Sequence, residues 1–242
     1  MRIFLYVFFL ILFSPGAFLP GQSTAFVFTG GPTFSNQQWD NAYEREMLLK
    51  WHFAVAAESV DNEENRAALL AQFGYHPKGS AIRFRYFVPN GPNVVTEEEF
   101  IFRNLSLILG AKQKFPAGEN ARFFYAGGIR GDYTLSTNLD ELADNNPFAA
   151  NYYPQDAFVR KWIFGLSIGG GTEWMFSELV GAQLTFWVHP DVTYQYDSPP
   201  IPNVIDPNNP GTITTLPARR VRNVALELSL GLRLLRKVEY VE

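Results

Sequence analysis

The chain of 242 residues contains no cysteine. This absence excludes thiol catalysis, disulfide bonds, cysteine-ligated metals and a lipid anchor on an N-terminal cysteine. The chain also lacks a block of Lys and Arg, and its formal net charge is −4. Its composition therefore gives no reason to expect a nucleic-acid partner.

Long apolar runs are also absent, except at the start of the chain. Arg2 precedes an apolar run at 3–13, and Pro15, Gly16 and small residues follow it. This pattern predicts a secretory signal peptide at 1–24, cleaved between Gly21 and Ala25, because the run is too short to span a membrane as a helix. Residues 25–242 are expected to form one domain. No later run approaches the ~20 apolar residues of a membrane helix, so a membrane location would require strands.

The most informative pattern in the rest of the chain is an alternation with a period of two residues. Successive side chains of a strand point to opposite faces of the sheet, so one face of 161–176 and of 222–235 is large and apolar, and the other is small or charged. The residues expected to face lipid are Trp162, Phe164, Leu166, Ile168, Trp174, Leu226, Leu228, Leu230 and Leu232.

Repeated along the chain, this pattern predicts eight strands, with a bulge near Arg103–Asn104. Their expected ranges are 25–34, 46–60, 67–87, 97–115, 121–136, 158–176, 179–196 and 219–236. Connections after the second, fourth and sixth strands are short, and the others are longer, as in outer-membrane barrels. The expected fold is an all-β, eight-stranded antiparallel up-and-down transmembrane β-barrel in the bacterial outer membrane, with both termini in the periplasm.

A secreted soluble barrel of the lipocalin type also closes eight strands, and it is the competing architecture. Its polarity is reversed, with apolar side chains inside. Eight strands enclose a space just wide enough for side chains. The small and charged face fits that space better than the aliphatic face of 222–235 does, so the sequence favours the membrane barrel.

The expected interior contains charges of both signs. Buried charges are costly unless they are paired, so we expect a network of ion pairs across the barrel; the alternative is a narrow path for an ion or solute. The predicted members of the network are Lys50, His52, Glu58, Arg83, Arg85, Arg130, Asp132, Lys161, Glu173, Glu227 and Arg233.

A lipid-modifying enzyme is the alternative from another functional class. Its candidate residues are His189 and Asp191, near the end of the seventh strand, where such a pair could orient a base. No G-x-S-x-G motif and no spaced His/carboxylate set occur, so the sequence predicts neither a metal nor a cofactor. His76, beside Pro77, is interpreted as part of a kink.

The two longest connections, 137–157 and 197–218, are the expected sites of interaction with envelope proteins. They are rich in Pro and Asn and carry Tyr152, Tyr153 and Ile205 as apolar contacts. Functional residues are disproportionately found on loops held by a rigid scaffold.

The mature chain resembles the small outer-membrane β-barrel proteins of the Bacteroidota, the PorT-like and OmpA-barrel group. The resemblance rests on KGSAIRF (78–84), YAGGIRGDY (125–133) and LELSLGLRLLRKVEYV (226–241). It implies a non-catalytic structural or interaction protein of the envelope, accessory to secretion or gliding machinery.

Overall fold

A computed structural model describes residues 23–39, 45–60, 67–86, 94–145, 152–206, 209 and 211–236. The predicted signal peptide lies outside them, apart from Ser23 and Thr24, which begin the first strand. The elements in chain order are β1 (Ser23–Trp39), β2 (Leu48–Val60), β3 (Ala67–Tyr86), β4 (Val94–Pro116), β5 (Ala121–Thr137), α2 (Leu139–Asn145), η2 (Asp156–Phe158), β6 (Trp162–Met175), β7 (Val180–Pro190), β8 (Tyr196–Ser198), β9 (Ile201–Ile205), β10 (Ile213–Leu216) and β11 (Arg219–Arg236).

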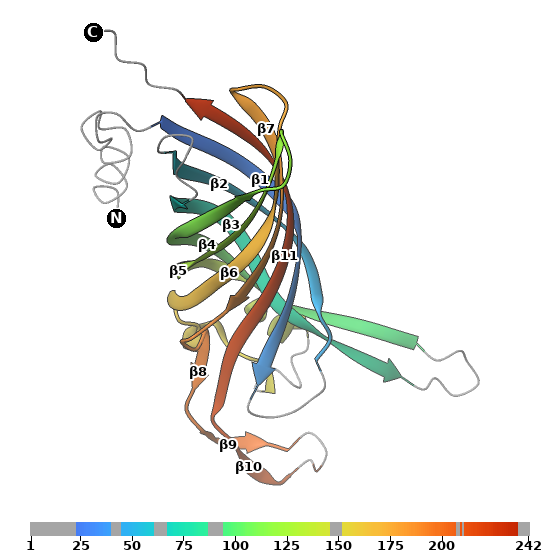
Figure 1. The fold of residues 1–242 in the computed structure, drawn as a ribbon. Helices are drawn as coiled ribbons and strands as arrows, with labels where there is room; N and C mark the ends of the chain where they lie inside the picture. Colours follow the sequence, from blue (N-terminus) through green and yellow to red (C-terminus); the bar gives the residue numbers. More distant parts are fainter. Residues whose placement is uncertain are drawn as a thin grey trace.

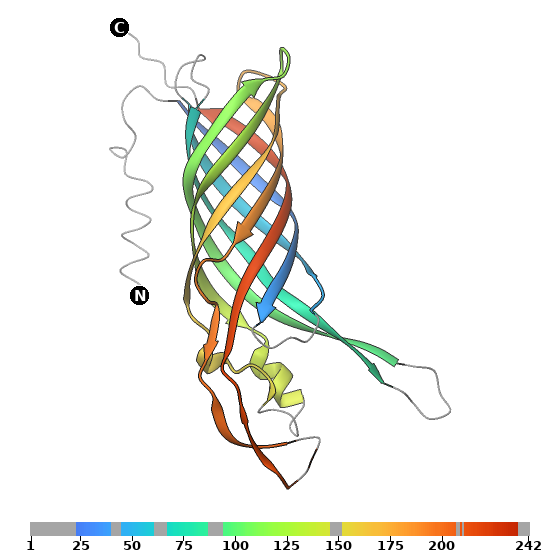
Figure 2. The ribbon, with the colours of Figure 1, turned by 60° about the horizontal axis from the view of Figure 1, so that its bottom comes forward.

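Eight of these strands close into a ring (Figures 1 and 2). Each of β1 to β6 pairs antiparallel with the next strand, β7 pairs with β11, and β11 pairs with β1 from Thr24↔Arg236 to Trp39↔Val221. Closure leaves no unpaired edge in the barrel. The predicted eight-stranded antiparallel up-and-down barrel is therefore confirmed.

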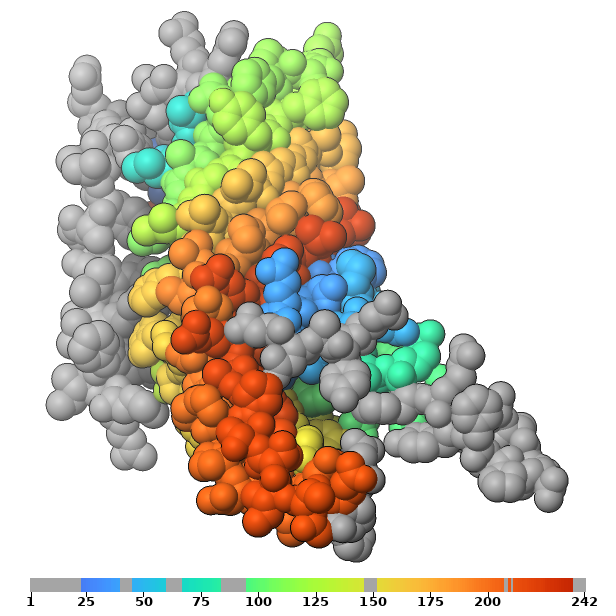
Figure 3. Space-filling model, turned by 90° about the horizontal axis from the view of Figure 1, so that it is seen from below, coloured from blue at the N-terminus to red at the C-terminus, as the bar shows by residue number. Residues whose placement is uncertain are grey.

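The two ends of the barrel differ in the length of their connections and in the elements that these connections contain. At the end that we call the turn end lie the short connections β4–β5 and β6–β7, together with the start of β1 and the end of β11 (Figure 2). The opposite end, the loop end, carries α2, η2 and the β9–β10 hairpin. Figure 3 views the loop end, where the β9–β10 segment and the β3–β4 hairpin stand on different sides of the barrel.

The outer surface of the barrel is apolar. Trp162, Phe164 and Ile168 on β6 are 57–62% exposed, and Leu230 on β11 is 70% exposed. The aliphatic side chains from Val224 to Leu234 cover about 33 Å of strand at ~3.3 Å per residue. With a tilt of about 40°, this is a belt about 25 Å tall, the height of the apolar band of membrane barrels. The barrel is of the transmembrane type.

No helix among the described residues is long and apolar enough to cross a membrane.

The strand boundaries differ from prediction mainly at the loop end. β1 runs to Trp39 instead of residue 34, and β7 ends at Pro190 instead of 196. The connection expected at 197–218 contains β9 and β10, and 137–157 contains α2. The bulge predicted near Arg103–Asn104 is confirmed, since the β4–β5 register shifts there. The extra residue lies on β5, where Leu135 has no partner between Thr134 and Ser136.

Candidate functional site

The barrel interior is filled by side chains that form successive layers along its axis. The inward residues of β7, counted from the turn end, are Gln183, Thr185, Trp187 and His189, and Asp191 follows directly after the strand; all five are buried. Each faces a different set of partners, because inward side chains lie two residues, about 7 Å of strand, apart.

The first layer, nearest the turn end, is an ion-pair cluster. Lys112 Nζ lies 2.6 Å from Glu58 Oε1 and also contacts Glu173. Lys114 Nζ lies 2.9 Å from Glu58 Oε2 and 3.2 Å from Glu173 Oε2. Each carboxylate thus contacts both ammonium groups. Reciprocal pairing of this kind offsets the cost of burying the charges.

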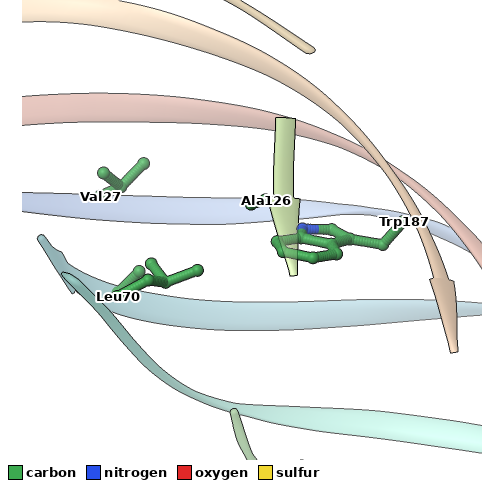
Figure 4. Close-up of a cluster of buried hydrophobic side chains, with 5 residues drawn as sticks. Val27, Leu70, Ala126 and Trp187 are labelled. Carbon is green, nitrogen blue, oxygen red and sulfur yellow. The ribbon is translucent and has the colours of Figure 1, made fainter. Parts of the chain in front are cut away.

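The second layer is apolar and contains a small cavity. Val27, Leu70, Ala126 and Trp187 come from four strands and lie together in the lumen (Figure 4). The cavity beside them has room for about one water molecule. Trp187, which is 4% exposed, fills the lumen beside this cavity.

The third layer gathers all three histidines of the chain around one carboxylate. Glu227 Oε1 lies 2.7 Å from His76 Nδ1, and Glu227 Oε2 lies 3.1 Å from His189 Nε2 and 3.8 Å from His52 Nε2. Thr33 donates to Glu227 Oε1 at 3.3 Å. Four strands supply these groups besides β11, which carries Glu227, so this carboxylate connects more than half of the barrel wall.

The fourth layer is a second set of ion pairs. Asp132 contacts Lys78 and accepts a hydrogen bond from Arg130 Nε at 3.1 Å. Asp191 contacts Arg130, lies 3.3 Å from Lys78 and accepts from Asn223 Nδ2 at 2.7 Å. The two cations balance the two carboxylates, so this layer is neutral as a group.

The loop-end mouth is closed by an apolar plug. Its buried members are Phe100, Phe102, Leu139, Tyr196 and Val221, and Leu139 begins α2. Arg45 covers the plug, with its Cζ 4.0 Å from the centroid of the Trp39 ring. Burial, and then the charge of Arg219, lower the pKa of Arg45 to about 10.

Most residues predicted for the lumen do lie inside it. His52, Glu58, Arg130, Asp132, Glu173, Glu227 and Arg233 are buried. Lys50 stands at the loop-end rim, partly exposed, 2.6 Å from Glu99. The residues predicted to face lipid, which are Trp162, Phe164, Leu166, Ile168, Trp174, Leu226, Leu228, Leu230 and Leu232, lie on the outer surface, with Leu226 the least exposed of them.

The prediction was wrong for Arg83 and Lys161. Arg83 is half exposed and pairs with Glu46 at 2.7 Å, because β3 extends past the barrel and its inward residues are the even ones. Lys161 is exposed and precedes β6. The side chain of Arg85 lies outside the described residues.

Several functional side chains were missed by the sequence reasoning. His76 and Lys78 are in-register strand residues, paired with Asn104 and Phe102, and not part of a kink. Lys112 and Lys114 share the inward parity of β4. Because Lys112 and Lys114 are two residues apart in a strand, the sequence could have predicted that both face the lumen. His189 and Asp191, the predicted candidate pair, are both buried in the lumen, His189 on β7 and Asp191 directly after it.

Ser167, His189 and Glu227 form a hydrogen-bonded series. Ser167 Oγ lies 2.8 Å from His189 Nδ1, and His189 Nε2 lies 3.1 Å from Glu227 Oε2. This order of groups activates a serine nucleophile in hydrolases. Here all three side chains are at most 1% exposed, so the structure provides no path for a substrate to Ser167. No group of His, Asp or Glu among the described residues has the geometry to hold a metal ion.

No protein-family model and no curated protein sequence matches the chain. Among solved structures, Neisserial surface protein A is 12% identical and covers 87% of this chain and 97% of its own, with a TM-score of 0.44. The outer membrane protein OprG from Pseudomonas aeruginosa is 10% identical and covers 88% and 97%, with a TM-score of 0.46. The outer membrane protease OmpT from Escherichia coli is 9% identical and covers 90% and 98%, with a TM-score of 0.37. Likenesses at this level concern the barrel shape and assign no role.

Removal of the Glu227 carboxylate tests how far the third layer supports the barrel. The substitution Glu227→Ala leaves His76, His189 and Thr33 without their shared partner, and we expect it to lower the free energy of unfolding by about 2–5 kcal/mol. Urea unfolding in detergent micelles measures the change. The matched control, Glu99→Ala, removes a partly exposed partner of Lys50 and should cost less than about 1 kcal/mol. Equal unfolding midpoints for the two variants would contradict the central place of Glu227.

Proposed function

We propose that the protein is a closed, non-catalytic barrel of the bacterial outer membrane that anchors a docking surface for envelope proteins at its loop end. The observation that carries the proposal is the exposed apolar pair Ile205–Ile213, held on a hairpin beyond a barrel whose lumen is filled.

The apolar belt supports the membrane placement. Large side chains such as Trp51, Phe53 and Ile129 are more than 60% exposed on the barrel exterior, which is unfavourable in water and favourable in lipid. Short connections at one end and long ones at the other match barrels whose short turns lie in the periplasm. In this orientation both chain termini are periplasmic and the hairpins face outward.

The filled lumen argues against transport and against catalysis inside the barrel. Two ion-pair layers, the histidine layer and the apolar plug occupy the interior between Glu58 and Tyr196. Wide barrels conduct because their interior is open, whereas eight strands leave room only for side chains. Function is therefore expected at the ends of the barrel.

Two hairpins extend the loop end well beyond the belt. β4 has 23 residues and β3 has 20, about twice the 9–11 residues that a membrane strand needs. Their pairing continues in register to Tyr86↔Val94, and the hairpin projects away from the barrel (Figure 2). A paired ribbon of this length presents its side chains far from the membrane surface.

The β9–β10 hairpin carries the apolar contact. Ile205 and Ile213 are directly paired and are 65% and 70% exposed. Tyr152 donates to the Ile205 carbonyl at 3.1 Å and thereby ties the hairpin to the segment before η2. Tyr153, also predicted as a contact, packs partly buried against the plug instead. Exposed apolar pairs outside the lipid belt are typical of interaction sites.

The envelope proteins that we propose as partners belong to a secretion or gliding apparatus. The resemblance to PorT-like barrels implies secretion or gliding machinery. A lipid-modifying enzyme remains the alternative role, and it would have to act outside the lumen, because His189 and Asp191 are buried.

The docking surface can be tested by replacing both isoleucines with threonine. Threonine keeps the β-branched shape that favours the hairpin but removes the apolar contact. We expect the double variant Ile205→Thr, Ile213→Thr to recover about tenfold less of the envelope proteins that co-purify in mild detergent. Thr215→Ser on the same hairpin is the control, and heat-modifiable gel migration verifies folding. Undiminished recovery from a folded double variant would refute the docking role.

Protease treatment of intact cells tests the orientation. The proposed topology predicts cleavage within 137–157 and 197–218, with the barrel itself protected. Cleavage confined to 61–65 and 116–120 would show that the barrel is inserted the other way round. Mass spectrometry of the released fragments distinguishes the two results.

A further inference from the structure

The outward face of β11 changes abruptly toward the loop end. From Leu234 back to Val224 the outward side chains are aliphatic, and the next two, Arg222 and Arg220, are charged and exposed. An arginine on the lipid face costs about 2–4 kcal/mol at the bilayer midplane and little at the interface. The boundary between hydrocarbon and headgroups therefore lies between Val224 and Arg222.

A defined set of contacts holds these arginines at the boundary. The Tyr194 ring lies under both, with its centroid 4.3 Å from Arg222 Cζ and 5.6 Å from Arg220 Cζ. Asp197 Oδ1 lies 3.4 Å from Arg220 Nε, and Asp197 also contacts Arg160. We call Arg160, Arg220, Arg222, Tyr194 and Asp197 the arginine cluster.

The arginine cluster keeps an excess of positive charge. It has three guanidinium groups and one carboxylate, so two positive charges remain. The side chains of Arg160 and Arg220 are 50% and 53% exposed, which leaves donors free for a ligand. Stacking on Tyr194 restricts the guanidinium planes, so little conformational freedom is lost when a ligand binds.

The cluster joins the apolar belt directly. Thr193 accepts a hydrogen bond from the Phe164 amide at 2.9 Å, and the Val192 amide donates to the Phe164 carbonyl at 2.9 Å. The segment that carries Tyr194 is therefore fixed to the start of β6. Beside it, Val192 and Trp162 are 55% and 62% exposed.

We infer that the arginine cluster binds the phosphate group of a membrane-lipid headgroup, while Val192, Phe164 and Trp162 contact the acyl chains of the same lipid. Guanidinium groups match phosphate oxygens with two parallel hydrogen bonds. A lipid satisfies the charged and the apolar halves of the surface together, whereas a free anion would satisfy only the first. The inference rests on the membrane placement proposed above.

The test compares lipid retention in nanodiscs of phosphatidylcholine that contain a minor fraction of phosphatidic acid. Native mass spectrometry of the released barrel measures the enrichment of bound phosphatidic acid over phosphatidylcholine. Each interfacial arginine is expected to contribute about fivefold, so the double variant Arg220→Gln, Arg222→Gln should lose about 25-fold. The control, Arg122→Gln with Arg236→Gln, removes the same charge at the turn end and should retain most of the enrichment.

Each other outcome overturns a specific claim. Equal enrichment in the wild-type protein and the Arg220/Arg222 variant would refute the inference, as would an equal loss in the turn-end control. Competition by inorganic phosphate at the concentration of the lipid would identify a free-anion site instead. Replacing phosphatidic acid by a fatty acid tests charge alone, and equal enrichment of the carboxylate would refute phosphate recognition. Failure of the folded protein to insert into discs would refute the membrane placement itself.

Discussion

The narrow interior of an eight-stranded barrel is the constraint on which the rest of the structure depends. The ring has room for side chains only, and the lipid outside offers no hydrogen-bond partner, so each inward charge must find its counterpart within the lumen. Glu227 illustrates this most clearly. It contacts groups on four other strands, among them all three histidines of the chain, so one carboxylate joins distant parts of the wall. The ion-pair layers on either side of it, centred on Lys112 and Asp132, apply the same rule.

This constraint is the reason why we propose a function at the ends of the barrel and not in its lumen. Trp187 and the plug at Tyr196 and Phe100 fill the lumen with side chains at two levels. The ion pairs and hydrogen bonds of the lumen stabilise a rigid cylinder. The chain that continues beyond the loop end of this cylinder carries the hairpins and the arginine cluster. The docking surface and the lipid-binding surface that we propose both lie outside the lumen, at the loop end of this cylinder.

The sequence predicts the barrel well where one face of a strand lies on the apolar outer surface and the other faces the lumen, as on β6 and β11. The prediction fails where a strand continues past this belt, because its two faces no longer differ in polarity. The alternation predicts Arg83 in the lumen, but β3 continues past the ring of strands there, and Arg83 is half exposed and pairs with Glu46 while Ile82 packs against the plug. His76 and Lys78 were missed because Pro77 and Gly79 suggested a kink, which in-register pairing with β4 overrides. The convergence of three histidines on Glu227 follows from the shear of the closed sheet, which a one-dimensional pattern does not contain.

Conductance of the purified protein in planar bilayers tests the central claim of a filled lumen most directly. Folding is first verified by heat-modifiable migration, and insertion by protease protection of the barrel. A filled lumen predicts a current indistinguishable from that of the bare bilayer, because the charged layers and the plug occupy its cross-section. Discrete, voltage-driven current steps from the folded wild-type protein would contradict it and would show that a continuous aqueous path passes Glu227.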